Sequence, residues 1–306
     1  MRLQFTNVSC VLGMLSAATL VHTTAMADDQ TTPAAAANMV SSITPDTRYG
    51  LFNGLDHRSF YSQGNYPEPF LVDDTGLENN EARLDWRHKQ AGDSKSDVVK
   101  AEYEKGFGLA TVEIEIPYER DVNAGAVTQG IGNISGGVRC PFYQYVSTSG
   151  FFDTTFGGAF EFGIPASSAI SVNPEFVPKI FNDTKIGDHF TLQSVYGWSI
   201  FGGGGSQGGL QTFEYAYVFG WTIQHSELPL PGIQQIIPIC ELKGETQLNK
   251  DNPGQNTLLG DVGFRLNLKA IGRVQPRPGF AFVFPLDNAG YNDTHWGIVT
   301  SLAFEF

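Results

Sequence analysis

Apolar and polar residues alternate along the chain from Glu81 to Phe306 in short segments separated by turn residues. Alternation with a period of two gives a strand one apolar face and one polar face, because successive side chains point to opposite sides. In segment 211–224, Phe213, Tyr217 and Trp221 share the apolar face. We therefore predict an all-β protein with about twelve antiparallel strands. The predicted strands are 81–90, 97–105, 109–119, 131–145, 155–165, 172–181, 189–201, 211–224, 234–248, 258–269, 279–286 and 295–306.

The last segment, 295–306, alternates to its final residue. Trp296 and Phe306 fall on one face, and Ser301 and Glu305 fall on the other. An unpaired apolar edge strand is an aggregation hazard, whereas a closed barrel pairs its last strand with its first. The pattern thus favours a transmembrane, up-and-down β-barrel, and an even number of strands places both of its ends in the periplasm.

The same segment resembles the C-terminal strand of Gram-negative outer-membrane barrels, which ends on a phenylalanine. The resemblance implies that Phe304 and Phe306 form an assembly signal read by the barrel-assembly machinery. It also implies that the protein lies in the bacterial outer membrane, with membrane lipid and lipopolysaccharide as partners.

Charged residues occupy the polar faces of these strands; Glu113 and Glu115, for example, alternate with Ile114 and Ile116. A Lys or Arg facing lipid costs about 2–4 kcal/mol at the membrane midplane, so the polar faces are expected to line a lumen. Neighbouring charges of opposite sign predict ion pairs across it. The lumen-lining candidates are Arg83, Asp85, Arg87, Lys100, Glu102, Glu104, Glu113, Glu115, Arg139, Glu161, Glu214, Glu241, Lys243, Glu245, Asp261, Arg265 and Glu305.

A barrel of this size encloses less space than a porin with sixteen to eighteen strands, so we expect a narrow or partly plugged lumen. The alternative is a soluble periplasmic β-sandwich or lipocalin-like barrel, in which the apolar faces would point inward. The large aromatic residues of segment 211–224 and its neighbours are hard to fit inside a small barrel, and this favours the membrane barrel.

The residues before the predicted barrel divide into three parts. Residues 1–27 combine an early arginine, an apolar run over 11–21 and Ala25-Met26-Ala27, which is typical of a cleaved signal peptide. Residues 28–48 are rich in Ala, Thr, Ser and Pro, which predicts a flexible periplasmic leader. Residues 49–80 are aromatic and contain two prolines, and we expect them to form a plug or a periplasmic cap. The barrel then occupies 81–306.

Composition and charge exclude one class of partner and one kind of structural element. The net charge of −13, with only 19 Lys and Arg, excludes nucleic acid as a partner because phosphate binding needs a basic surface. No later segment has the roughly 18 consecutive apolar residues of a membrane-spanning helix.

Turns are expected at 106–108, 182–185, 229–231 and 276–278, all on the periplasmic side. Cys140 and Cys240 fall on strands that are not neighbours, so we predict two free thiols.

Few residues indicate catalysis. His57 and Ser59 have the spacing at which some outer-membrane esterases and lipases place base and nucleophile, but they precede the first strand. An ordinary polar turn is the simpler interpretation, and we expect no enzyme. The histidines lack metal-ligand spacing, so no structural metal or cofactor is predicted.

Three short motifs carry a family resemblance: 104–108 (Glu-Lys-Gly-Phe-Gly), 114–118 (Ile-Glu-Ile-Pro-Tyr) and 130–135 (Gly-Ile-Gly-Asn-Ile-Ser). A tight turn, a strand ending in Pro-Tyr and a Gly-x-Gly-Asn start of the next strand resemble the transporter family linked by name to the meta pathway of phenol degradation. The family usually has Asp where Asn133 stands. The resemblance implies an outer-membrane protein that passes small molecules and leaves the permeant undefined. We predict a channel or passive transporter; the alternatives are an esterase using His57 and Ser59 or a closed structural barrel.

Overall fold

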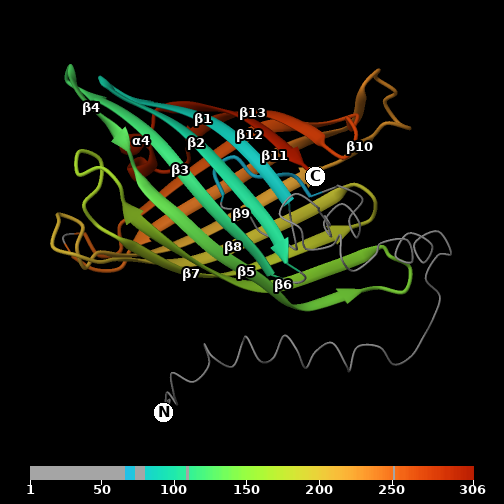
Figure 1. Cartoon of the computed structure of the whole chain (residues 1–306), viewed down its shortest axis with the longest axis horizontal. Coiled ribbons are helices and arrows are strands. Elements are labelled where there is room, and N and C mark those ends of the chain that lie inside the picture. Colours follow the sequence, from blue (N-terminus) through green and yellow to red (C-terminus); the bar gives the residue numbers. More distant parts are fainter. Residues whose placement is uncertain (1–65, 73–79, 108–109, 251) are drawn as a thin grey trace, which may run out of the picture. The chain divides into compact units, whose positions relative to one another are not determined.

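The computed structural model describes residues 66–72, 80–107, 110–250 and 252–306. Apart from one short helix, their regular structure consists of strands, as the alternation predicts (Figure 1). The strands are β1 (Asn80–Ala91), β2 (Ser94–Phe107), β3 (Ala110–Asn123), β4 (Ala126–Ile131), β5 (Asn133–Val146), β6 (Phe152–Pro165), β7 (Glu175–Ile186), β8 (Phe190–Phe201), β9 (Gln211–Trp221), β10 (Ile223–Gln224), β11 (Ile233–Gln247), β12 (Asn256–Leu268), β13 (Gln275–Pro285) and β14 (Trp296–Glu305).

These strands close into one antiparallel barrel. Each pairs with its neighbour along the chain, and β14 pairs with β1 to complete the ring. Breaks at Gly132 and Thr222 divide β4 from β5 and β9 from β10, and each pair acts as one strand of the barrel. The barrel thus has twelve strands, and the predicted fold class is confirmed. The Phe306 N–H donates to the Asn80 carbonyl at 3.1 Å, so β1 begins where β14 ends.

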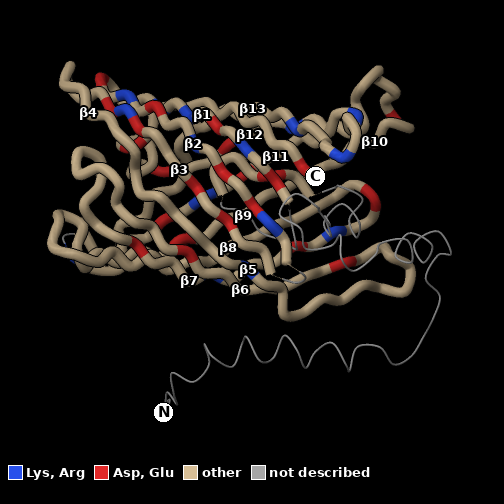
Figure 2. Tube along the Cα trace, in the orientation of Figure 1, with Lys and Arg blue, Asp and Glu red and all other residues tan. Residues whose placement is uncertain are grey.

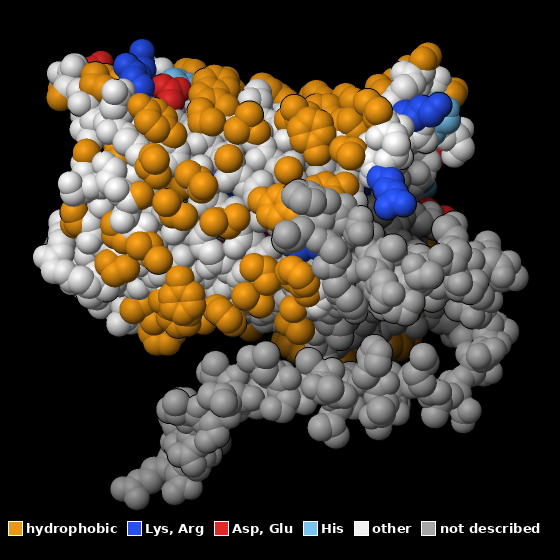
Figure 3. All heavy atoms as spheres, in the orientation of Figure 1, with side chains coloured by type: hydrophobic (Ala, Val, Ile, Leu, Met, Phe, Trp, Pro, Cys, Tyr) orange, Lys and Arg blue, Asp and Glu red, His pale blue; other side chains and the backbone are white. Residues whose placement is uncertain are grey.

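The two faces of the wall have opposite polarity. Large apolar side chains point outward; Phe213 and Phe282, for example, are 40% and 42% exposed. Orange hydrophobic side chains cover the visible wall, while its charged side chains gather near the ends (Figure 3). Glu113, Glu115 and Lys243 lie on the opposite register and are half-buried. A soluble sandwich or lipocalin would bury the aromatic residues instead, so the alternative prediction is wrong.

Among the differences from the predicted strand ends, three change a turn or a hairpin. Residues 182–185 are not a turn, because they extend β7 and pair with 153–156 of β6. Residues 276–278 are not a connection, because they belong to β13 and pair with β14. Pro276 and Pro278 have no N–H group to donate. Because β12 pairs only with residues 279–285 of β13, it needs no hydrogen bond from these two prolines. The β3–β4 hairpin extends past the predicted end at 119; its turn residues Ala124 and Gly125 have φ of 49° and 87°, as a tight hairpin turn requires.

A single described helix, α4 (Asn288–Asp293), lies between β13 and β14. Asp287 caps it by accepting a hydrogen bond from the Gly290 N–H at 2.6 Å. None of the helical structure in the described ranges is long and apolar enough to cross a membrane.

Candidate functional site: the barrel lumen

The charged residues predicted to line the lumen all lie on the interior register of the wall. They alternate with outward apolar residues, as Glu113 alternates with Val112 and Ile114. Along the Cα trace, red and blue positions recur on β1, β2 and β3 (Figure 2). The buried members are Arg83, Asp85, Glu102, Glu104, Arg139, Glu241, Asp261, Arg265 and Glu305. The half-buried members are Arg87, Lys100, Glu113, Glu115, Glu161, Glu214 and Lys243, and Glu245 is exposed.

Arg83 lies among four carboxylates. It contacts the Glu102 carboxylate through Nη2, and its Nε lies 3.3 Å from Asp85 Oδ2. Glu81 and Glu68 add carboxylate oxygens 3.8 and 3.7 Å from the guanidinium. An arginine buried among several carboxylates keeps its charge balanced without water, so this cluster fixes the geometry of β1 against β2.

Two further bridges continue the network along β2 and β3. Arg139 reaches from β5 to Glu104, and its Nη2 lies 3.1 Å from Glu113 Oε2. Lys100 Nζ lies 2.5 Å from Glu115 Oε1. Lys100 and Glu115 join the neighbouring strands β2 and β3, and Arg139 links β5 to β3 and, across β3, to β2, so this side of the lumen is a cross-linked charged wall.

Two groups of three carboxylates come close enough to share a cation. They are Glu68, Glu81 and Glu305, and Glu102, Glu104 and Glu113. Arginines already form ion pairs with both groups. Arg83 and Arg277 contact the first group, and Arg83 and Arg139 contact the second. The arrangement is therefore that of an ion-pair network.

A short piece of chain lies within this lumen. Residues 66–72, here called the lumen segment, are all buried and come from the predicted plug or cap. The Glu241 carboxylate on β11 accepts hydrogen bonds from the backbone N–H groups of Phe70, Leu71 and Val72 at 2.6, 2.9 and 3.0 Å. Three successive N–H groups on one carboxylate give a directional anchor, since each bond is charge-assisted.

Two arginines hold the carbonyl side of the lumen segment. Arg265 donates to the carbonyls of Glu68 and Pro69, the second at 3.2 Å, and its Cζ lies 4.6 Å from the centre of the Phe70 ring. Arg87 Nη2 donates to the Phe70 carbonyl at 2.7 Å. The backbone of the segment is thus bound through both its N–H and its C=O groups.

The inner wall also carries apolar side chains among its charges, which the alternation did not predict. Val218, Ile237, Ile239 and Val283 point inward from β9, β11 and β13 and belong to the cluster that contains residues 70–72. These side chains would be exposed to water in an empty lumen, and the lumen segment covers them. The interior therefore combines ion pairs with apolar patches on the same strands.

The barrel wall also leaves room for the lumen segment. A Cβ on Gly279 of β13 would lie 2.8 Å from the Phe70 ring, closer than a side-chain carbon can approach. Glycine at this strand position therefore lets the aromatic ring lie against the backbone.

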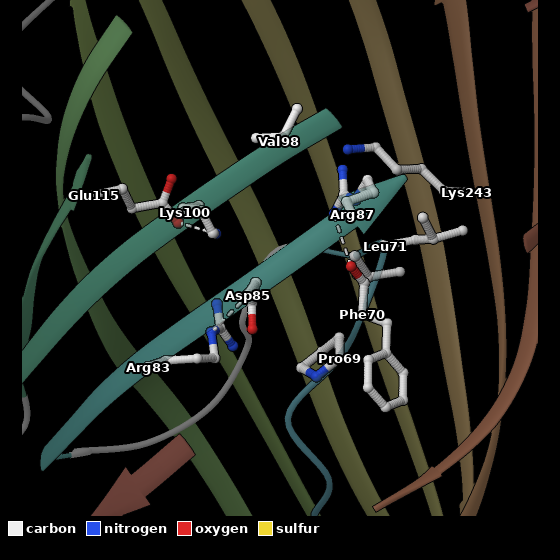
Figure 4. Close-up of a pocket in the computed structure, with 11 residues that line it drawn as sticks. Pro69, Phe70, Leu71, Arg83, Asp85, Arg87, Val98, Lys100, Glu115 and Lys243 are labelled. Carbon is white, nitrogen blue, oxygen red and sulfur yellow. Dashed lines mark hydrogen bonds and ion pairs between the residues drawn. The ribbon is translucent and has the colours of Figure 1, made fainter. Parts of the chain in front are cut away.

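A cavity of about 180 Å³ remains beside the lumen segment (Figure 4). It is lined by segment residues 69–72 and by β1, β2, β3 and β11. Its wall residues combine four cations, two carboxylates and one apolar side chain: Arg83, Arg87, Lys100, Lys243, Asp85, Glu115 and Val98. This is the described part of the lumen in which a solute could contact the charged wall and the lumen segment together.

The predicted lumen-lining set lacks several interior charges, among them Lys179, Arg277 and Glu68. Lys179 on β7 pairs with Glu161, and Arg277 on β13 pairs with Glu305. Glu68 of the lumen segment also reaches Arg277, at 3.8 Å. Lys179 and Arg277 are adjacent to prolines in the sequence. The prolines interrupt the alternation of polar and apolar residues that would otherwise have assigned both cations to the inner face.

Other sequence predictions have different outcomes. Cys140 and Cys240 are both unpaired, so the predicted free thiols are confirmed. Phe304 lies on the outward register of β14, and its role as an assembly signal stays a prediction. His57 and Ser59, the signal peptide 1–27, the leader 28–48 and most of 49–80 lie outside the described residues.

The sequence matches no protein-family model and no curated protein. Among solved structures, the chain is similar to an outer-membrane channel from Pseudomonas putida F1, with 9% identity and a TM-score of 0.49 over 79% of this chain and 100% of that one. It is also similar to the NanC porin, with 7% identity and a TM-score of 0.44 over 74% of this chain and 98% of the porin. It is similar as well to the KdgM porin in complex with disordered oligogalacturonate, with 12% identity and a TM-score of 0.37 over 73% of this chain and 98% of the porin. The resemblance to the meta-pathway transporter family stays a prediction.

Proposed function

We propose that this protein is a bacterial outer-membrane channel that passes small molecules passively through a narrow, charged lumen. The observation that carries the proposal is the opposite polarity of the two faces of a closed barrel. A closed barrel satisfies its backbone hydrogen bonds internally, which is the requirement for strands in lipid. An outer wall of exposed aliphatic and aromatic side chains fits hydrocarbon, and an inner wall of paired charges fits water.

The partners follow from the same polarity. Outer-membrane lipid and lipopolysaccharide would surround the apolar wall, and the barrel-assembly machinery would recognise Phe304 and Phe306. We place the end of the barrel where β1 begins and β14 ends in the periplasm, as in other single-chain bacterial barrels.

The lumen segment supports a channel of restricted bore. Its seven residues fill part of the interior, so ions and solutes would pass beside it or after its displacement. A closed structural barrel is the second candidate, favoured by the anchoring of the segment to Glu241, Arg265 and Arg87.

Planar-bilayer recording of the purified full-length protein tests the proposal. We expect small, discrete current steps from a preparation whose gel band shifts on boiling, as folded barrels do. A folded preparation that gives no current, either as the wild type or after Glu241→Gln weakens the segment anchor, would refute the channel and leave the closed barrel.

A further inference from the structure

Two loops meet at the end of the barrel where β14 ends. Residues 225–232 join β10 to β11, and residues 269–274 join β12 to β13. The Lys269 N–H donates to the Gly232 carbonyl at 2.8 Å, so the two loops are hydrogen-bonded to each other. Gln275, directly after the second loop, pairs with Glu305, which places both loops at this end. We call the two loops together the rim loops.

Three large apolar side chains of the rim loops are exposed. Leu228 is 42%, Leu230 38% and Ile271 77% exposed. The outward register of β12, which leads into the second loop, is apolar to the end of the strand, with Val, Phe, Leu and Leu at 262, 264, 266 and 268. The exposed side chains of the rim loops therefore continue the lipid-facing wall.

Two basic side chains flank Ile271. Lys269 and Arg273 are both exposed, and neither side chain forms an ion pair or a hydrogen bond with another residue in the described part of the chain. Blue and orange side chains lie together at this end of the molecule (Figure 3). In a protein with a net charge of −13, a loop with two cations and no acid is a local positive patch.

The first rim loop holds the single acid of the two loops, and other groups already contact it. Glu227 Oε2 accepts a hydrogen bond from the Gln224 N–H at 2.9 Å and lies 3.6 Å from His189 Nδ1. In the same loop, His225 Nδ1 donates to the Ile233 carbonyl at 2.8 Å. The cations of the second loop thus have no acidic partner within the rim loops.

We propose that the rim loops bind anionic phospholipids at the membrane surface, with lipid phosphates on Lys269 and Arg273 and acyl chains against Ile271. Exposed apolar side chains beside basic ones are the combination that binds an anionic lipid surface. The patch borders a wall that faces hydrocarbon, and this continuity favours lipid over a soluble partner. The assignment to the inner leaflet rests on the proposed function, which places this end of the barrel in the periplasm.

Native mass spectrometry of the full-length protein tests the site. The protein is released from mixed micelles with equal amounts of phosphatidylglycerol and phosphatidylcholine that have the same acyl chains. We expect at least about tenfold more phosphatidylglycerol than phosphatidylcholine to be retained, because each basic side chain at the surface attracts the anionic headgroup. Lys269→Gln/Arg273→Gln should lower this ratio at least about fivefold.

Arg120→Gln/Lys250→Gln is the matched control. It makes the same change in charge at two exposed cations at the other end of the barrel, which lie near an acid and a carbonyl group, respectively. We expect this double variant to keep the wild-type ratio.

Three results would overturn the proposal: equal retention of the two lipids by the wild type, an unchanged ratio in Lys269→Gln/Arg273→Gln, or a dimer that holds no phospholipid and dissociates in Ile271→Asn. Arg273→Gln alone, in a loop outside the strands, supplies the comparison if the double variant fails to give a heat-shifted gel band. Lipid retention requires no permeation. A lipid preference without conductance would therefore remove the channel function and keep the lipid site, and conductance without a lipid preference would remove only the lipid site.

Discussion

The anchor of the lumen segment can be tested by Glu241→Gln. Three backbone N–H groups of residues 70–72 donate to the two carboxylate oxygens of Glu241. Glutamine replaces one oxygen with an amide nitrogen, which accepts no hydrogen bond. Since Leu71 and Val72 share one oxygen, the variant keeps at most these two bonds and loses the bond to Phe70.

The expected free-energy change follows from these bonds. A hydrogen bond to a charged group contributes about 1.5–3 kcal/mol and a neutral one about 0.5–1.5 kcal/mol. One lost bond and two weakened bonds together cost about 3–5 kcal/mol. Asp261 lies directly across from Glu241 in the β11–β12 register, and removal of the repulsion between them returns about 1 kcal/mol. The net loss of about 2–4 kcal/mol shifts the ratio of undocked to docked segment by about 30-fold to 1000-fold.

Single-channel recording measures this shift as the ratio of open to closed time and as the size of the current steps. We expect Glu241→Gln to raise the ratio at least about 30-fold over the wild type. Glu245→Gln is the matched control, because it makes the same charge change on the same face of β11 at an exposed position outside the anchor. Identical recordings from Glu241→Gln and the wild type, with both proteins folded, would refute the anchoring role.

Other substitutions separate the lumen from the outer wall. Arg265→Gln should lower the free energy of unfolding by about 3–5 kcal/mol, because it leaves buried carboxylates and segment carbonyls without their cation; the midpoint of urea denaturation measures this. Gly279→Val should displace Phe70 and raise conductance. Adding Phe70→Ala should make room for the valine and reduce this rise. If the two substitutions changed conductance independently, the contact between Gly279 and the Phe70 ring would be contradicted. Val262→Arg, on the 49% exposed outer face, should cost up to about 2–4 kcal/mol in refolding into phospholipid vesicles, and no cost there would argue against a lipid-facing wall.

Strand positions and the facing of most side chains could be predicted because the alternation that encodes them is local. Glu113 and Ile114 point to opposite sides wherever the strand lies, so their neighbours in sequence suffice to assign the faces. The prediction failed where local signals pointed to a turn. The polar run 182–185 and the prolines of 276–278 look like connections, yet partner strands hold both in extended conformation.

The alternation alone implies a barrel of strands with an apolar outer wall and charges on its inner face, because a period of two fixes which residues share a face. The pairing of the charges and the contents of the lumen follow from the three-dimensional fold. Glu241 lies about 170 residues from the backbone groups it binds, and Arg265 about 196 residues from Pro69. Contacts of this kind depend on the strand register around the whole barrel and on the position of the lumen segment. The alternation of neighbouring residues predicts neither of these.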